Sequence, residues 1–352
     1  GNFYSLYTVA NYPGLPGLTS TQLGNKDLKW EKTEQTDIGL EFAVVKSRIN
    51  AELDFYNKQT TGLLLFVNIP ATNGYTSVTK NLGSLENKGF EIGINSVNID
   101  GRDFRWSTSL NAAYNQNKIL NIGGQIIEAG FGLTQRAVEG LPIGEFYAQQ
   151  FVGVDPETGD ALYLGEDGKP TSDFGAAARV ALGNSNPKWT GGLSNSFSYK
   201  GFGLDMLFTF VYGNKVYNAG GEFMSAGFYN GFDNQTADIK DAWTGPGDIT
   251  NVPRIGYFYG SGYQNSSRFL YDGSYIRFRS ASLSYTLPKS LVEKIKLGYV
   301  KVYISGQNLI TITKYPGDPE VNVDTLGNIG GGQDFYTIPQ PRTITFGLNV
   351  KF

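Results

Sequence analysis

Paired carboxylates are the candidates for covalent chemistry in this chain. The sequence has no His and no Cys, which removes imidazole bases, thiolate nucleophiles and the usual zinc ligands. Paired carboxylates are present, for example Asp155 with Asp160 and Glu166 with Asp167, and a hydrolase can use such a pair as acid and base. Acidic residues are also typical of solvated turns. We favour the turn interpretation and expect no enzymatic activity.

Residues 165–170 are the best candidate for a metal site. They read Gly-Glu-Asp-Gly-Lys-Pro, and carboxylate and carbonyl oxygens are the ligands that calcium prefers. The run departs from the ligand spacing of a calcium loop, and Lys169-Pro170 interrupts it. We therefore expect no bound cofactor or metal, with calcium in this loop as the alternative. The Gly330-Gly331-Gly332 run lacks the Lys-Ser/Thr of a phosphate loop, so we interpret it as a flexible loop.

Aromatic side chains are the other group of candidate binding residues. Residues 257–263 read Tyr-Phe-Tyr-Gly-Ser-Gly-Tyr, and a Trp precedes them in the same long loop. Exposed aromatic side chains stack on sugar rings or pack against peptide and protein surfaces. A membrane girdle or packing within the loop is the alternative, and the sequence does not choose between them. The candidates are Trp243, Tyr257, Phe258, Tyr259 and Tyr263.

The elements that position these residues are β-strands, and the last eleven residues show the pattern most clearly. Ile344, Phe346, Leu348, Val350 and Phe352 fall on one parity, with polar residues or Gly between them. Period two is typical of a strand with one apolar and one polar face. A soluble domain gains little from a terminal Phe, whereas an outer-membrane barrel would place it in the interfacial aromatic girdle. The last strand of a soluble sandwich is the alternative.

The same alternation predicts nine long strands, joined by connections that alternate in length. Short connections follow the first, third and fifth strands and a modest one follows the seventh, whereas long loops follow the others. A β-sandwich would not be expected to sort its loops in this way, but an outer-membrane barrel has short turns at one end and long loops at the other. The long loops, which would then lie outside the cell, are residues 67–87, 119–187, 214–272 and 315–340.

Three local patterns add detail to this prediction. The apolar parity changes between Phe278 and Ala281, which predicts a β-bulge near Arg279. Residues 289–296 are expected to form two helical turns. Residues 1–32 contain turn residues such as Pro13-Gly14 and are expected to be irregular.

Composition bounds the class of protein. The net charge of −3 does not suggest nucleic-acid binding. No run approaches the roughly 20 apolar residues of a membrane helix, but alternating barrel strands do not need one. The predicted fold class is all-β, a transmembrane antiparallel β-barrel. No signal peptide opens the chain at Gly1, so an exported protein would be processed or a fragment. Bacterial single-chain barrels have an even number of strands, so nine strands suggest that N-terminal strands are missing.

Over essentially residues 25–352 the chain resembles the C-terminal half of the SusC/RagA family of TonB-dependent outer-membrane transporters. The stretches that carry the resemblance share their order and spacing with the family. They are Leu28-Lys29-Trp30-Glu31 with Gly39-Leu40-Glu41-Phe42, Asn87-Lys88-Gly89-Phe90-Glu91, Ser274-Tyr275-Ile276-Arg277-Phe278 through Leu287-Pro288, Val302-Tyr303-Ile304-Ser305-Gly306-Gln307-Asn308-Leu309, and Pro339-Gln340-Pro341-Arg342 through Phe352.

The resemblance implies a barrel of 22 strands closed by a plug domain. The plug, the segment that contacts the TonB complex and the N-terminal strands would precede this chain, so residues 1–352 would be the C-terminal portion of the barrel. The resemblance further implies a SusD-like surface lipoprotein as a lid, contact with outer-membrane lipid, and an oligosaccharide or peptide as substrate. The expected location is the outer membrane of a Gram-negative bacterium of the Bacteroidetes type, with a chain that crosses the membrane many times.

We therefore interpret the chain as part of an active nutrient importer that does no covalent chemistry. A surface adhesive or structural β-protein is the first alternative, and a secreted β-rich hydrolase is the second. The aromatic candidates named above would bind substrate or lid. The apolar residues of the terminal strand would serve as a signal to the barrel assembly machinery, namely Phe346, Leu348, Val350 and Phe352.

Overall fold

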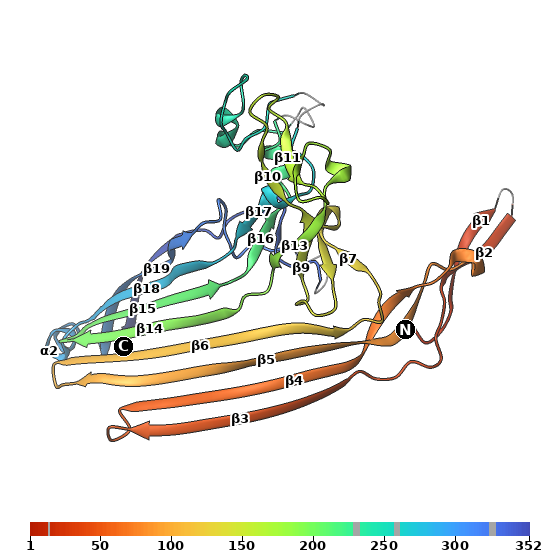
Figure 1. The fold of residues 1–352 in the computed structure, drawn as a ribbon. Helices are drawn as coiled ribbons and strands as arrows, with labels where there is room; N and C mark the ends of the chain where they lie inside the picture. Colours follow the sequence, from red (N-terminus) through yellow and green to blue (C-terminus); the bar gives the residue numbers. More distant parts are fainter. Residues whose placement is uncertain (13–14, 228–232, 257–260, 324–328) are drawn as a thin grey trace.

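A computed structural model describes residues 1–12, 15–227, 233–256, 261–323 and 329–352. Nine long strands form one antiparallel sheet in which neighbours in the chain are neighbours in space, apart from the insertions between them (Figure 1). They are β3 (Lys32–Val44), β4 (Ile49–Asn68), β5 (Ser77–Asp100), β6 (Phe104–Asn121), β14 (Trp189–Tyr199), β15 (Phe202–Tyr212), β18 (Tyr275–Thr286), β19 (Tyr299–Thr313) and β21 (Thr343–Lys351). The predicted nine strands are confirmed, with β3 and β21 at the edges of this sheet.

Short connections lie at one end of the sheet, together with the C-terminus, and the long connections lie at the other end (Figure 1). The turn between β14 and β15 has Lys200 and Gly201 at positive φ, which is the two-residue turn that suits the twist of a hairpin. Between β18 and β19, α2 (Lys289–Val292) and η6 (Glu293–Ile295) form the predicted helical turns, and they bury Val292. Apart from residues 69–76 between β4 and β5, the connections are therefore sorted by length in the fold.

The predicted bulge near Arg279 is confirmed. The register of β18 against both β15 and β19 shifts beside Phe278, and Asn308 on β19 adopts a positive φ of 51°. An extra residue in a strand reverses the parity of the side chains that follow it. The face that carries Phe278 is consequently continued by Ala281 and Leu283.

The sheet has one apolar and one polar face, and the strand register aligns them. Leu40, Leu53 and Ile92 are paired across β3, β4 and β5, while the adjacent rung pairs Glu41 with Glu52. The apolar side chains are uncovered: Leu40 is 57% and Phe346 is 77% exposed. An apolar face of this extent is not stable in water.

Two rows of aromatic side chains border the apolar face. The row near the long connections follows the register through Phe55, Phe90, Tyr114, Trp189 and Tyr212, with ring centroids 5.9 Å apart for Phe55 and Phe90 and 5.1 Å apart for Tyr114 and Trp189. The row near the short turns consists of Phe104, Trp106, Phe197, Tyr199, Phe202 and Tyr285.

The separation of the two rows fits a membrane. Trp189 and Phe197 are eight residues apart on β14, which is about 27 Å along the strand. A strand tilt of about 40° reduces this to about 20 Å along the membrane normal, close to the ~25 Å apolar band of outer-membrane barrels. The rows have the place and spacing of interfacial girdles.

The apolar face has a polar interruption near the second row. Asn195 Oδ1 accepts hydrogen bonds from Trp106 Nε1 at 2.9 Å and from Thr108 Oγ1 at 2.7 Å. Because these groups satisfy one another, they can lie on an apolar face without the cost of an unpaired polar group.

Two expectations about the sheet's far end are wrong. Residues 1–32 are not all irregular, because β1 (Leu6–Tyr12) and β2 (Leu15–Gln22) form a hairpin that projects beyond the long-connection end (Figure 1). The predicted loop 67–87 is also too long, since β5 begins at Ser77 and leaves only a short connection that contains η1 (Ala71–Asn73). Beyond the aromatic row burial does not alternate along the strands: β1 and β2 are largely exposed, whereas the adjacent Val78 and Thr79 of β5 are both buried.

The long connections fold into small sheets of their own, which we call the loop domain (residues 122–188, 213–274 and 314–342). Its strands are β7 (Ile127–Ala129), β8 (Gln135–Ala137), β9 (Glu145–Gln149), β10 (Phe151–Val154), β11 (Ala161–Leu164), β12 (Pro170–Thr171), β13 (Arg179–Asn184), β16 (Lys215–Asn218), β17 (Leu270–Asp272) and β20 (Gln333–Asp334). Its short helices are η2 (Phe131–Leu133), η3 (Phe174–Ala176), α1 (Gly221–Met224), η4 (Ala237–Asp241) and η5 (Ser267–Phe269).

Contacts between the connections hold the loop domain together. Phe146, Tyr217 and Phe269 form a buried core that joins the first two connections. β16 and β20 pair in parallel and join the second to the third. The described strands of residues 119–187 add no strand to the nine-stranded sheet after β6 ends, in agreement with the predicted excursion. None of the helices in the described ranges is long and apolar enough to span a membrane.

Candidate functional site on the polar face and in the loop domain

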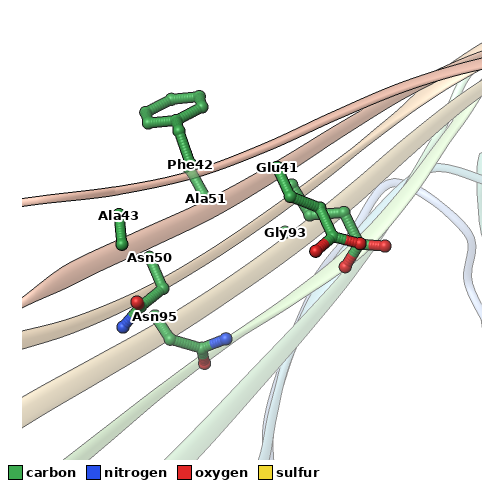
Figure 2. A pocket seen from close by; sticks show the side chains of 8 residues that line it. Glu41, Phe42, Ala43, Asn50, Ala51, Gly93 and Asn95 are labelled. Atoms are coloured by element: carbon green, nitrogen blue, oxygen red, sulfur yellow. The ribbon is translucent and has the colours of Figure 1, made fainter. Parts of the chain in front are cut away.

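The polar face of β3, β4 and β5 gathers acidic side chains. Glu41 pairs with Glu52 and Asp54 pairs with Glu91 in the strand register. Hollows of about 430 Å³ and 280 Å³ lie beside them. Like charges directly opposite each other destabilise a sheet unless water screens them. Figure 2 shows Phe42 on the other side of the sheet from Glu41, so this face suits a water-filled lumen.

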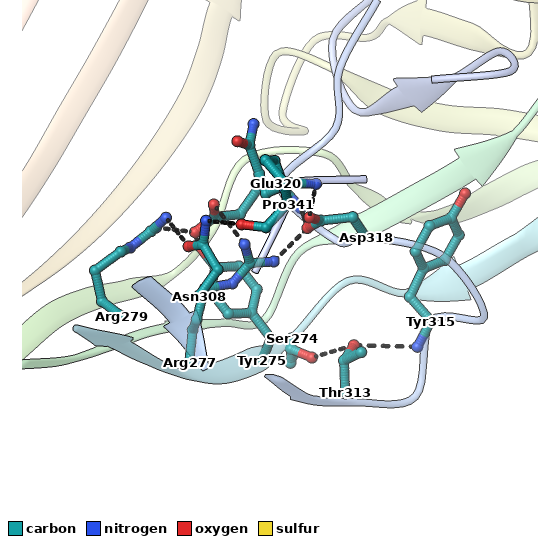
Figure 3. Close-up of polar contacts among 11 residues, drawn as sticks. Ser274, Tyr275, Arg277, Arg279, Asn308, Thr313, Tyr315, Asp318, Glu320 and Pro341 are labelled. Atoms are coloured by element: carbon teal, nitrogen blue, oxygen red, sulfur yellow. Dashed lines mark hydrogen bonds and ion pairs between the residues drawn. The ribbon is translucent and has the colours of Figure 1, made fainter. Parts of the chain in front are cut away.

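A buried ion cluster joins the connection after β19 to the polar face of β18 (Figure 3). Arg277 is only 1% exposed and pairs with Asp318 and, at 3.2 Å, with Glu320. Arg279 pairs with the same Glu320, to which the Tyr275 hydroxyl also donates at 2.7 Å. The β-bulge near Arg279 lies within this cluster. The ion pairs attach the connection after β19 to the polar face of the sheet.

Hydrogen bonds complete the attachment of this connection. Burial acts to raise the pKa of Asp318, but the Arg277 guanidinium and the backbone N–H groups of Gln340 and Glu320 outweigh it and hold the pKa below its usual value. The N–H of Gln340 donates to Asp318 Oδ2 at 2.9 Å, and Asn308 Nδ2 donates to the carbonyl of Pro341 at 3.1 Å. The family resemblance included β18, but no local sequence pattern indicated which acidic side chains pair with its arginines.

The structure places Trp243 in a packed position within the loop domain. Its Nε1 donates to the carbonyl of Pro156 at 2.9 Å. Its ring lies against Gly159, where a Cβ atom would come within 2.5 Å of the indole. The Trp243 side chain is half-buried. Its contacts favour packing within the loop over a ring that is free to bind a partner or a ligand.

The rest of the aromatic candidates are only partly described. Tyr257, Phe258 and Tyr259 lie outside the described residues. Tyr263 is half-buried, next to Gly262, whose carbonyl accepts from Arg268 Nη1 at 2.7 Å. The geometry therefore brings Trp243 and Tyr263 into the same loop domain and leaves their role in binding as a prediction.

The candidate catalytic and metal carboxylates are engaged in turns. Asp155 Oδ1 accepts from the N–H groups of Glu157 and Thr158, and Asp160 pairs with Arg254 at 2.8 Å. Asp167 Oδ1 accepts from the N–H of Lys169 at 3.0 Å. These contacts support the turn interpretation. Within the described ranges no group of three or more acidic side chains is arranged to hold a metal ion.

One half-buried carboxyl was not indicated by any sequence pattern. Glu222 accepts from the Tyr217 hydroxyl at 2.6 Å, and the side-chain amide of Asn265 is placed to donate to it as well. Burial raises the pKa of Glu222 to about 7, although the Tyr217 hydrogen bond acts to lower it. Only the folded arrangement of the loop domain brings these three residues together.

The terminal strand has the faces that its sequence predicts. β21 pairs with β19 and places Phe346, Leu348 and Val350 on the apolar side of the sheet. Phe352 follows the strand and is 95% exposed. A role of these residues as an assembly signal stays a prediction.

Comparison with known proteins gives these faces a context. Residues 1–309 match the family model for "TonB dependent receptor-like, beta-barrel". The chain belongs to this receptor family. Its nine strands are part of the family's antiparallel β-barrel.

The receptor chain is 35% identical to TonB-dependent receptor P3 of Formosa agariphila, over 99% of its own length and 37% of that protein. It is 29% identical to SusC of Bacteroides thetaiotaomicron, over 93% of the chain and 32% of SusC. The solved structure of the RagAB peptide transporter is similar with a TM-score of 0.84 and 29% identity, over 100% of this chain and 39% of that one. The predicted resemblance to SusC and RagA is confirmed, and this chain spans less than two fifths of the length of P3 and SusC.

Proposed function

We propose that the chain is the C-terminal portion of an outer-membrane importer that takes up an oligosaccharide or a peptide. The observation that carries the proposal is the two-faced sheet. An exposed apolar face lies between two aromatic rows, and an acidic, hydrated face lies opposite. The similarity to the RagAB transporter extends along the whole sheet and loop domain. In this proposal the apolar face contacts outer-membrane lipid, and the polar face lines the path of the substrate.

The importer does no covalent chemistry on its substrate. It binds the substrate at the loop domain and releases it inward when the lumen opens. The energy comes from the TonB complex, which acts through a plug domain that precedes this chain in the whole protein. A SusD-like surface lipoprotein covers the loop domain as a lid. The location is the outer membrane of a Gram-negative bacterium of the Bacteroidetes type.

The aromatic candidates would contribute to the lid interface or to the substrate chamber. Interface energy concentrates in a few aromatic and Arg anchors. Trp243 and Tyr263 belong to the loop domain, at the end of the sheet where a lid would close. The packing of Trp243 on Gly159 suits a role in holding the binding surface in shape. We assign the contacts with lid or substrate to Tyr257, Phe258 and Tyr259, which lie outside the described residues.

Deletion of the gene for the full-length receptor tests the proposal in the native host. We expect loss of uptake of one class of oligosaccharide or peptide, restored by the wild-type gene. A tagged full-length receptor should copurify with a surface lipoprotein.

Replacing Tyr257, Phe258 and Tyr259 together by Ala should weaken lipoprotein binding or uptake at unchanged receptor levels in the outer membrane. Unchanged uptake after deletion, with no copurifying lipoprotein, would favour an adhesive or structural role.

A further inference from the structure

A cavity of about 510 Å³ lies between the polar face of the sheet and the loop domain. Its lining is rich in one residue type. Six Asn residues from β5, β6 and three connections surround it: Asn87, Asn115, Asn117, Asn186, Asn214 and Asn322. We call it the Asn cavity. Its volume is in the range of small-ligand sites, and neither of the described aromatic candidates, Trp243 and Tyr263, lines it.

Asn214 gives the first indication of a ligand. Its side chain is 8% exposed, and its Oδ1 has no hydrogen-bond partner among the described residues. Gly273 makes room for it, because a Cβ atom at residue 273 would lie 2.6 Å from Asn214 Nδ2. Native proteins rarely leave a buried acceptor unpaired, and those that do often use it to bind a ligand or water.

The other Asn side chains use only part of their hydrogen-bonding capacity. Asn115 Oδ1 accepts from the Tyr56 hydroxyl at 3.0 Å, and Asn322 Oδ1 accepts from the N–H of Gly332 at 2.9 Å. Asn186 Nδ2 donates to the carbonyl of Ile143 at 2.7 Å. These bonds orient the amides. In the described part of the chain they leave the NH₂ groups of Asn115 and Asn322 as donors and Asn186 Oδ1 as an acceptor.

The cavity carries no uncompensated charge. Among its described lining residues the charged side chain is Glu320, which is already paired with Arg277 at 3.2 Å and with Arg279. A peptide would bring terminal charges and ionic side chains that find no counter-ion here. A sugar hydroxyl both donates and accepts, as a row of amides with free NH₂ and C=O groups requires.

We propose that the Asn cavity is a subsite for an uncharged sugar segment of the imported substrate. This proposal rests on the proposed import function and adds a substrate class to it. Asn214 Oδ1 accepts a hydrogen bond from a sugar hydroxyl. Asn115, Asn322 and Asn186 supply further bonds around the same ring.

The test measures binding to the purified full-length receptor by calorimetry. The probes are three mixtures: short neutral oligosaccharides, uronic-acid oligosaccharides of the same length, and neutral peptides with capped ends. Asn214→Leu removes the unpaired acceptor at nearly the same volume, so stability should be unchanged or higher. Binding of the neutral oligosaccharides should fall about tenfold, the effect of losing one well-placed hydrogen bond.

Thr209→Val is the matched control. Thr209 Oγ1 is also buried without a partner in the described structure, but Thr209 does not line the Asn cavity. This variant should keep full binding. Asn186→Ala changes an exposed side chain. Its effect on oligosaccharide binding can therefore be measured even if Asn214→Leu does not fold.

Three results would overturn the Asn cavity as a sugar subsite. One is wild-type affinity in both Asn variants, and another is no binding of neutral oligosaccharides to the wild type. The third is binding of capped peptides that depends on Asn214. Uptake in the native host separates this failure from a failure of import. One outcome is that the gene deletion abolishes uptake but Asn214→Leu and Asn186→Ala do not reduce it. The import function is then supported, and the proposed sugar subsite is contradicted.

Discussion

Glu222 is a residue whose behaviour follows from burial in the loop domain. Its pKa of about 7 in the folded protein lies above the ordinary value of about 4.3 for an unfolded chain. Below about pH 4 both states are protonated and the residue has no effect on stability. As the pH rises towards 7 the unfolded chain ionises first, so the loop domain loses stability, and the full cost remains above pH 7.

Glu222→Gln should therefore stabilise the loop domain at about pH 8 by on the order of 3 kcal/mol, and should have little effect near pH 4. The measurement is protease cleavage within residues 213–274 of the full-length receptor, taken as the ratio of variant to wild type at each pH. The ratio cancels the pH dependence of the protease. Equal protection at both pH values would contradict the buried, high-pKa assignment.

Arg277 has the opposite role, because its buried guanidinium pairs with the carboxylates of Asp318 and Glu320. Removing Arg277 takes away the guanidinium that pairs with Asp318, while Glu320 keeps Arg279. Breaking a buried ion pair costs about 3–5 kcal/mol. Arg277→Met should release the connection that follows β19, seen as faster hydrogen exchange in residues 315–323. Arg102→Met, in an exposed turn, is the control. If exchange is unchanged, the cluster does not hold the connection.

At the scale of elements, the sequence predicted best where a strand has two different environments. The alternation in β21 and the change of parity at Arg279 both follow from strands with one apolar and one polar face. β1, β2 and the first part of β5 were missed because burial does not alternate along them: β1 and β2 are largely exposed, and the adjacent Val78 and Thr79 are both buried. The short strands of the loop domain were missed because two to six residues contain too few repeats of a pattern.

The candidate site was less predictable than the strands. Trp243 and Gly159 are distant in sequence and meet only in the folded loop domain. Arg277 with Asp318, and Tyr217 with Glu222 and Asn265, are likewise brought together by tertiary packing. Asn is common in turns, so single Asn residues gave no sign that six of them line one cavity.

The terminal strand carries a prediction of its own. Phe352 lies at the short-turn end of the sheet and packs on little of this chain, being 95% exposed. Phe352→Ala should therefore leave the stability of an assembled barrel nearly unchanged. It should lower the amount of receptor in the outer membrane if the residue is part of an assembly signal. The measurement is heat-modifiable receptor in outer-membrane fractions. Full levels of the Phe352→Ala protein would argue against that role.

At the scale of the whole molecule, the surroundings of the two faces of the sheet distinguish a barrel from a soluble domain. In the proposed barrel, the aromatic rows and the uncovered apolar side chains face lipid on one side. The acids of β3, β4 and β5 require water on the other, since charged groups on a lipid-facing surface are costly. A soluble sandwich or adhesive domain would cover the apolar face with a second protein layer.

Spin-label accessibility distinguishes these cases most directly. The chain has no Cys, so single labels can be attached in it at Glu41→Cys, Phe42→Cys, Asp54→Cys and Phe55→Cys. The receptor is full-length, reconstituted in lipid vesicles and free of other cysteines. Labels at residues 42 and 55 should be relaxed strongly by oxygen, which concentrates in lipid, and little by a water-soluble nickel complex. Labels at residues 41 and 54 should not show the lipid response. The same oxygen response at neighbouring residues, or a lipid response at residues 41 and 54, would contradict the barrel faces assigned here.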